Sequence, residues 1–283
     1  MKIKKVGVVG CGLMGSGIVI TCAQSGYPVV VSEVNEQFLN KGMALVNSFL
    51  TKSVEKGKIT QQDKDAILGR IKGTTNTKDF QDCDLAIEAA IENMDLKKKI
   101  FADLDKVTPK HAILATNTSC LSIIDMAMQT AQPDKVLGLH FFNPVPIMTC
   151  LEIVRTIATS DETLEIGKEF GKSLGKTIVI AKDTPGFLVN YLLMPFLMDA
   201  IRMLDAGVAT KEDIDTAIRL GLNHPMGPLT LADLIGLDTC FFVTSAIYEE
   251  FKDPKYNPPP LLRKMVTAGR LGRKTGKGFY DYK

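Results

Sequence analysis

Apolar and polar positions alternate in a repeating way along the first part of the chain, where short, continuous apolar runs are separated by longer segments of helical periodicity. Short β-branched runs predict strands that are buried on both faces, as in a parallel sheet. Their alternation with helices predicts an α/β fold with a doubly wound, mostly parallel sheet. The expected strands are Val6–Val9, Val29–Ser32, Leu85–Glu88, 112–115 and Val136–Phe141.

A long helical segment interrupts this alternation between the second and third of these strands. It extends from residue 36 to about residue 56, and its neighbour continues to about residue 70. An insertion of this length exceeds the usual connection in such a sheet. We therefore expect it to contact a ligand.

The pattern changes after Lys182, where Asp183-Thr-Pro-Gly is a turn signal. Beyond it Leu, Met and Ile recur at helical spacing. The expected helices cover about 186–206, 211–221, 228–236, 239–251 and 260–268, before a basic, glycine-rich tail. The chain is thus predicted to form an α/β domain over 1–184 and an all-α domain over 185–283, which agrees with the tendency of cores to split beyond roughly 250 residues.

The charge balance and the cysteine content limit which binding partners and bound metals are expected for this chain. The 34 basic residues nearly balance the 32 acidic ones, so neither nucleic acid nor a membrane surface is an expected partner. The six cysteines are scattered without a Cys-x-x-Cys pair, and we expect no metal site, no disulfides and a cytoplasmic protein. The apolar stretch 187–201 is shorter than the ~20 residues that span a bilayer, and no signal peptide is recognisable at the start.

A glycine-rich segment, Gly10-Cys-Gly-Leu13-Met14-Gly15, lies between the first strand and the first helical segment. Gly10 permits a tight turn, Gly12 lets the backbone approach a pyrophosphate, and Gly15 allows close packing of helix on strand. The phosphates would bind at the helix N-terminus, which favours negative charge. The segment predicts a Rossmann-type dinucleotide site.

Glu33 follows the second strand directly, 21 residues beyond Gly12. An acidic side chain at this place hydrogen-bonds the adenosine ribose and repels a 2′-phosphate. Glu33 therefore favours NAD over NADP. The alternative is that the glycines serve only a tight turn and that Glu33 is a solvated strand end.

Histidine is the side chain best suited to exchange a proton with a hydroxyl group at neutral pH. Of the three histidines, His111 and His224 lie in predicted turns or loops, whereas His140 ends a strand. Ligands bind beyond the carboxyl ends of strands in open α/β sheets. A further strand is expected at 151–155. If the chain turns back near Pro146, Glu152 of this strand faces His140 across an antiparallel pair and can orient its ring. The alternative is a packed histidine with a solvated Glu152.

Two more polar side chains are candidates for the same site. Ser119 ends the segment Thr116-Asn-Thr-Ser, which follows the strand expected at 112–115. Ser119 could equally cap a helix that begins near Leu121. Asn190 lies in an apolar helical pattern, where a buried amide needs a partner because leaving it unpaired costs ~1–3 kcal/mol.

The whole chain resembles the short-chain L-3-hydroxyacyl-CoA dehydrogenases, most closely the bacterial 3-hydroxybutyryl-CoA branch. The matching segments include the glycine loop, His140-Phe-Phe-Asn-Pro-Val-Pro, Asp183-Thr-Pro-Gly-Phe-Leu-Val-Asn190, His224-Pro-Met-Gly-Pro-Leu, Gly236-Leu-Asp and Gly272-Arg-Lys-Thr-Gly-Lys-Gly-Phe-Tyr. This resemblance implies NAD as cofactor, an acyl-CoA thioester as substrate, and a homodimer through the helical domain, whose apolar faces exceed what it can cover alone.

The resemblance also implies roles for individual residues. Ser119, His140, Glu152 and Asn190 would form the catalytic group, with Ser119 and Asn190 holding the substrate. Glu92, Lys97, Ser119, Asn143 and Lys274 would surround the NAD. Lys52 and Lys56 lie one turn apart on a helical face and would contact CoA, although a solvated basic face is the alternative.

Two positions depart from the common family pattern. Thr149 replaces a basic residue that many relatives carry after Pro-Val-Pro, and Tyr191 replaces an arginine after the asparagine. These differences leave the preferred acyl chain open. Two other functions remain alternatives: a dehydrogenase of a free hydroxy or sugar acid, and a non-catalytic NAD-binding homologue.

Overall fold

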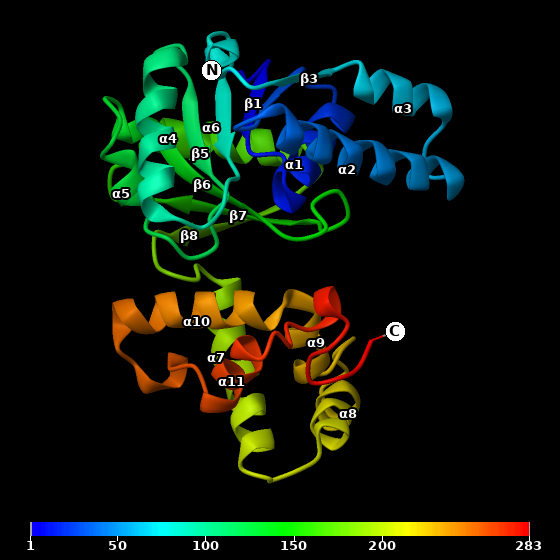
Figure 1. The fold of residues 1–283 in the computed structure, drawn as a ribbon. Helices are drawn as coiled ribbons and strands as arrows, with labels where there is room; N and C mark the ends of the chain where they lie inside the picture. Colours follow the sequence, from blue (N-terminus) through cyan, green and yellow to red (C-terminus); the bar gives the residue numbers. More distant parts are fainter. Residues whose placement is uncertain (1, 283) are drawn as a thin grey trace. The chain divides into compact units, whose positions relative to one another are not determined.

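The computed structural model describes residues 2–282 and divides into two compact units (Figure 1). The first unit ends at Thr184 and the second begins at Pro185. The first is built on a β-sheet with helices packed on it, and the second consists of helices and a short irregular tail.

One sheet of eight strands occupies the first unit, within the described residues. The strands are β1 (Val6–Val9), β2 (Val29–Ser32), β3 (Ile71–Thr74), β4 (Leu85–Glu88), β5 (Ile113–Thr116), β6 (Val136–Phe141), β7 (Cys150–Arg155) and β8 (Thr177–Lys182). Their order is β3-β2-β1-β4-β5-β6-β7-β8. The first six are parallel, β7 is antiparallel to β6, and β8 is parallel to β7. The predicted Rossmann-type sheet is confirmed.

Three details of the sheet differ from the sequence prediction. The strand expected at 112–115 runs from Ile113 to Thr116, because Thr116 pairs with Glu88 of β4. The edge strands β3 and β8 were not expected.

The order of the strands in the sheet reverses between β1 and β4. A doubly wound sheet binds ligands at this point, beyond the carboxyl ends of its strands.

Helices cover both faces of the sheet. They are α1 (Leu13–Gln24), α2 (Glu36–Glu55), α3 (Gln61–Leu68), α4 (Met94–Val107), α5 (Ile123–Ala127) and α6 (Asp161–Ser173), with short 3-10 turns at Thr77–Phe80 and Pro133–Lys135. Ile18 of α1, Leu50 of α2 and Phe170 of α6 belong to one buried core cluster with the strands. Gly138 of β6 faces Ile123 of α5 instead, so α5 lies on the opposite face.

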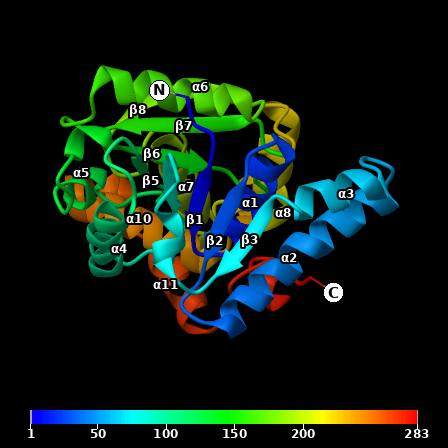
Figure 2. The same cartoon turned by 90° about the horizontal axis from the view of Figure 1, so that it is seen from above.

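The long insertion forms two helices, as predicted. Asn35 caps α2 by accepting a hydrogen bond from the Phe38 amide, and Thr60 and Asp63 form a reciprocal capping box on α3. Both views show α2 and α3 side by side, extending outward from the β3 edge of the sheet (Figures 1 and 2).

The second unit contains the predicted helices. They are α7 (Val189–Asp205), α8 (Lys211–Gly221), α9 (Pro228–Ile235), α10 (Leu237–Phe251) and α11 (Pro260–Thr267), with 3-10 turns at Pro254–Tyr256 and Arg273–Thr275. Helix α7 starts three residues later than expected, because Gly186 and Phe187 have positive φ angles that a helix does not allow. Asp233 fixes the tail by accepting hydrogen bonds from the amides of Phe279 and Tyr280.

Across residues 2–282, no single helix is long and apolar enough to cross a membrane. Helices α9 and α10, bent by 95° at their junction, pass that test together by length and composition only.

Candidate active site

The glycine loop joins β1 to α1 at the point where the sheet order reverses. Gly10 has a φ of +96°, and a Cβ there would lie 2.7 Å from the Ala89 carbonyl oxygen of the neighbouring strand connection. A Cβ on Gly15 would overlap the Gly10 carbonyl. A Cβ on Gly12, by contrast, would meet no atom within 4 Å. The open space at Gly12, at the N-terminus of α1, fits a pyrophosphate, with Leu13 and Met14 in the first turn of the helix.

Glu33 lies beside this loop at the end of β2. Its Oε1 accepts a hydrogen bond from the Cys11 amide at 2.6 Å, and its Oε2 accepts one from the Val34 amide at 3.2 Å. The side chain is only half-buried, so the carboxylate is fixed by the loop and still accessible to a ribose. Burial, followed by the nearby charge of Glu33, raises the pKa of the Cys11 thiol to about 12. The loop therefore holds a neutral cysteine next to the acid.

His140 and Glu152 form the predicted pair. The antiparallel register of β6 and β7 places them directly opposite each other, and His140 Nδ1 lies 2.5 Å from Glu152 Oε2. Both are buried, with 6% of His140 and none of Glu152 exposed. The alternative of a solvated Glu152 is therefore wrong. The ring of Phe142 packs on the imidazole with centroids 4.6 Å apart.

Asn117 holds the end of the His140 strand in place. Its Oδ1 accepts a hydrogen bond from the Phe141 amide at 3.0 Å, and its own amide donates to the Glu88 carbonyl at 2.8 Å. The buried amide thus ties the carboxyl ends of β4, β5 and β6 together. The sequence alone does not distinguish Asn117 from its neighbours in the polar segment that ends at Ser119.

A second polar network lies at the ends of β4 and β5. Lys97 is 1% exposed and donates to both carboxylate oxygens of the fully buried Glu88, at 2.7 and 2.8 Å. Glu88 also accepts from the Thr116 hydroxyl at 2.7 Å. Lys97 Nζ lies 3.4 Å from Glu92, which accepts from both the amide and the hydroxyl of Ser119. Ser119 is thereby connected to a buried ion pair.

Ser119 does not cap a helix. Helix α5 begins only at Ile123, and its N-cap position is Ser122, which makes no side-chain capping bond. Instead, Asp183 accepts hydrogen bonds from the amides of Ile123 and Ile124. The side chain of Ser119 is therefore committed to Glu92 rather than to a helix end.

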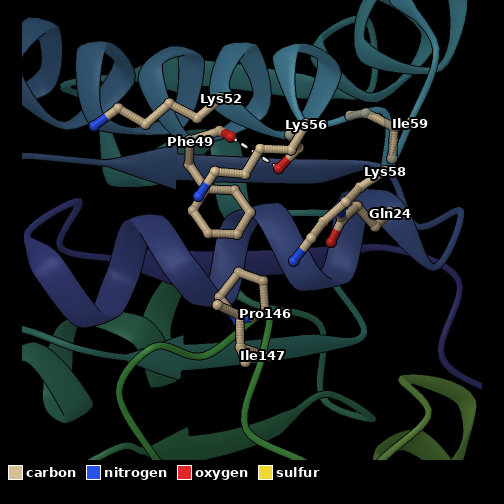
Figure 3. Close-up of a pocket in the computed structure, with 9 residues that line it drawn as sticks. Gln24, Phe49, Lys52, Lys56, Lys58, Ile59, Pro146 and Ile147 are labelled. Carbon is tan, nitrogen blue, oxygen red and sulfur yellow. Dashed lines mark hydrogen bonds between the residues drawn. The ribbon is translucent and has the colours of Figure 1, made fainter.

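A groove runs between α1, α2 and the connection from β6 to β7. It consists of two adjoining cavities of about 220 Å³ each, which share Phe49, Lys52 and Pro146. The inner cavity reaches Leu13 and Asn143 beside the glycine loop. The outer cavity is lined by Gln24, Phe49, Lys52, Ser53, Lys56, Lys58, Ile59, Pro146 and Ile147 (Figure 3).

The lysines in this groove have no carboxylate partner in the described part of the chain. Figure 3 shows Lys56 and Lys58 reaching from the end of α2 toward the Phe49 ring and the Pro146–Ile147 segment. Within residues 2–282, no ion pair involves Lys52, Lys56 or Lys58. All three lysines are exposed, so the alternative of a solvated basic face stays open. Their position around a cavity, without counter-ions, is what favours an anionic ligand there. Lys58 was not singled out in the sequence.

Two candidate residues belong to the second unit. Asn190 is the second residue of α7 and is half-buried, not buried as the apolar pattern predicted. Lys274 lies in the tail, with its Nζ 2.5 Å from Asp238 Oδ2. In the part of the chain that the structure describes, no cluster of three or more His, Cys, Asp or Glu side chains could hold a metal ion.

Comparison with known proteins gives matches over nearly the whole chain. The model of the 3-hydroxyacyl-CoA dehydrogenase NAD-binding domain matches residues 5–184, and that of the C-terminal domain of the same family matches residues 186–282. A 3-hydroxybutyryl-CoA dehydrogenase of Mycobacterium tuberculosis is 48% identical over 282 residues, which cover 99% of each chain. One of Clostridioides difficile is 48% identical over 278 residues, covering 98% of this chain and 99% of the relative.

Solved structures agree with these sequence matches. The crystal structure of FadB2 from Mycobacterium tuberculosis superposes with a TM-score of 0.99 at 47% identity, covering 100% of both chains. That of (S)-3-hydroxybutyryl-CoA dehydrogenase PaaH1 from Ralstonia eutropha gives 0.95 at 46% identity, again over 100% of both. The chain therefore belongs to the 3-hydroxyacyl-CoA dehydrogenase family, and its first unit is the NAD-binding domain of an NAD-dependent oxidoreductase.

Proposed function

We propose that this enzyme interconverts (S)-3-hydroxybutyryl-CoA and acetoacetyl-CoA. The observation that carries the proposal is the buried His140–Glu152 pair at the carboxyl edge of the sheet. The names of the relatives described above support the choice of substrate. Bound NAD would accept the hydride from C3 of the hydroxyacyl group, or donate it as NADH in the opposite direction.

His140 is the proposed proton-transfer residue. With Nδ1–H donated to Glu152, the other ring nitrogen, Nε2, takes the proton of the 3-hydroxyl group as the carbonyl forms. The buried carboxylate of Glu152 stabilises the imidazolium that results. In the reductive direction the protonated ring returns the proton to the developing alkoxide. Ser119 and Asn190 would hold the reacting oxygen and the thioester.

The cofactor would bind along the edge where the strands β1, β4 and β5 end. The glycine loop would receive the pyrophosphate, and Glu33 would bind the ribose hydroxyls. Glu92, Lys97, Asn143 and Lys274 are proposed as further contacts. Of these, Lys97 is held by Glu88 and Lys274 by Asp238, so both are already oriented by a carboxylate.

Coenzyme A would occupy the groove beside α2. Its phosphates need cations, and Lys52 and Lys56 line the cavity at one end. The inner cavity leads from there to Asn143, near the glycine loop, which gives the thioester a path toward the cofactor. The lysines suit the charged end of such a ligand, and Phe49 and Pro146 suit the less polar chain that extends from it.

We also propose that the protein is a cytoplasmic homodimer assembled through the second unit. Several large apolar side chains of this unit are exposed, among them Val208 (65%), Leu220 (71%) and Leu222 (60%). Apolar surface of this kind marks interaction sites when it is contiguous. Light scattering of the purified protein should give twice the mass of the chain.

The decisive experiment compares acetoacetyl-CoA with free acetoacetate as oxidants of NADH. The thioester should be reduced rapidly and the free acid hardly at all, because only the thioester can use the groove. Equal rates on the two substrates would overturn the thioester assignment and favour a dehydrogenase of free hydroxy acids. The absence of turnover with either would favour a non-catalytic NAD-binding protein.

A further inference from the structure

Lys176 is a buried cation whose side chain, among the described residues, has only backbone partners. It precedes β8, after the turn that ends α6, and 9% of the residue is exposed. Its Nζ donates to the carbonyl oxygens of Val145 at 2.6 Å and of Met148 at 2.7 Å. No ion pair of Lys176 occurs within residues 2–282. Burying an ammonium group without a counter-ion is costly, and burial accordingly lowers the pKa of Lys176.

The two carbonyls bracket the residues that form one wall of the groove. Pro146 and Ile147 lie between Val145 and Met148 and line the outer cavity across from its three lysines, which come from α2 and the turn after it (Figure 3). The segment is fixed further by the Thr177 amide, which donates to the Thr149 carbonyl at 2.7 Å. The Pro146–Ile147 wall is therefore held by hydrogen bonds to Lys176, which lies in the turn between α6 and β8.

The opposite side of this segment rests on α1. A Cβ on Gly17 would lie 2.9 Å from Val145 Cβ, so the glycine lets the segment approach the helix closely. Val145 is 2% exposed. The wall is thus clamped between Gly17 on one side and Lys176 on the other, and neither residue lines the outer cavity where the lysines lie.

We propose that Lys176 is a positioning residue for the groove: its two hydrogen bonds hold Pro146 and Ile147 at the distance from α2 that a CoA thioester requires. This inference rests on the proposed function. Lys176 would not touch the reacting atoms, and it would act only on the part of the substrate beyond the acyl group. Loss of its donors should release the wall and weaken binding of the CoA moiety.

The test compares Lys176→Met with the unmodified enzyme on two substrates. One is acetoacetyl-CoA, and the other is acetoacetyl-N-acetylcysteamine, which carries the same acyl thioester without the phosphates. Methionine keeps much of the apolar stem but donates no hydrogen bond. We expect the KM for acetoacetyl-CoA and the inhibition constant of free CoA to rise about tenfold, as a misplaced wall loses part of its binding energy. The KM for the short thioester and the Kd of NADH should stay within about twofold.

A matched control is Lys172→Met, because Lys172 is an exposed lysine of α6 that pairs with Glu169. It should leave every constant unchanged. If Lys176→Met does not fold, Lys176→Gln serves instead, since its amide is too short to reach both carbonyls. Equal losses on both substrates, a parallel loss of NADH affinity, or no change at all would overturn the positioning role.

The unmodified enzyme separates this inference from the proposed function. If it reduced free acetoacetate as fast as acetoacetyl-CoA, and free CoA did not inhibit it, the proposed function and the inference would both fail. If it is specific for the thioester and Lys176→Met behaves like the control, only the inference fails.

Discussion

The proposed proton transfer depends on His140 and on its contact with Glu152. Replacing His140 by Gln keeps a polar side chain but removes the group that exchanges protons. Reduction of acetoacetyl-CoA by NADH should fall by about 10²–10⁴-fold, the usual contribution of such a group. The Kd of NADH, measured by fluorescence, should be nearly unchanged because His140 lies on β6, away from the glycine loop at β1.

His111→Gln is the matched control for this variant. His111 is exposed and pairs with Asp84 at 3.0 Å through Nε2, so it also belongs to a histidine–carboxylate pair but lies outside the site. Its activity should equal that of the parent. A His140→Gln enzyme that kept activity within about tenfold of the parent would rule out His140 as the proton-transfer residue.

The position of a single residue in the site could be predicted from the sequence where the end of a strand, or the pairing register of two strands, determines it. Glu152 was found because a turn near Pro146 fixes which residue faces His140. The sequence indicates Glu88 only as the last residue of a buried strand, since nothing in its local sequence shows that Lys97 folds back onto it. Lys176 was missed for the same reason, because its partners lie about thirty residues earlier in the chain.

At the scale of elements, the glycine loop offers a test in which two similar substitutions act differently. Gly15→Ala places a methyl group against the Gly10 carbonyl, so the folded protein itself is strained. It should lose about 1–3 kcal/mol of stability, the usual cost of overpacking. Gly12 has a φ of −69° and open space, so Gly12→Ala should fold. It should lose less stability than Gly15→Ala, because alanine is only a weaker N-cap for α1.

The main effect of Gly12→Ala should appear when the cofactor is added. The new methyl group projects into the space that the pyrophosphate would use, and NADH affinity should fall about tenfold or more. Differential scanning fluorimetry and NADH titration measure the two effects separately. A Gly12→Ala protein that bound NADH as tightly as the parent would show that the pyrophosphate lies elsewhere.

Helices and strands could be predicted from the sequence where burial gives a recognisable pattern of apolar residues. The central strands are buried on both faces and form continuous apolar runs, such as Leu85–Glu88. Strand β3 reads Ile71-Lys-Gly-Thr and lies at the sheet edge with its two middle residues exposed, so it carries no apolar run. Strand β8 is apolar in sequence, but a run of this length does not distinguish strand from buried helix until its pairing with β7 is known.

At the scale of the whole molecule, the cysteines link stability to pH. All six are free, and five are buried, four of them in the first unit. Burial raises the pKa of the five buried thiols from 9.0 to about 12; these are Cys11, Cys22, Cys83, Cys120 and Cys240. In the unfolded chain the thiols ionise near their usual pKa. Between about pH 9 and pH 12 the folded protein therefore holds more protons than the unfolded one.

This difference in bound protons means that the free energy of unfolding should fall as pH rises above about 9. The stabilising contribution is complete below the unfolded pKa and is lost progressively toward the folded pKa, at up to about 1.4 kcal/mol per pH unit for each thiol. The lowered pKa of Lys176 acts in the opposite direction. Burial also raises the pKa of Tyr256, Tyr280 and Tyr282, which adds to the effect of the thiols.

Urea unfolding at pH 8, 9 and 10, with a reductant present, measures how steeply the free energy of unfolding falls with pH. Cys22→Ala should make that slope shallower by about one thiol's share, since one buried thiol no longer resists ionisation. A free energy of unfolding that stayed constant from pH 8 to pH 10 would show that the buried thiols ionise as readily in the folded protein as in the unfolded chain.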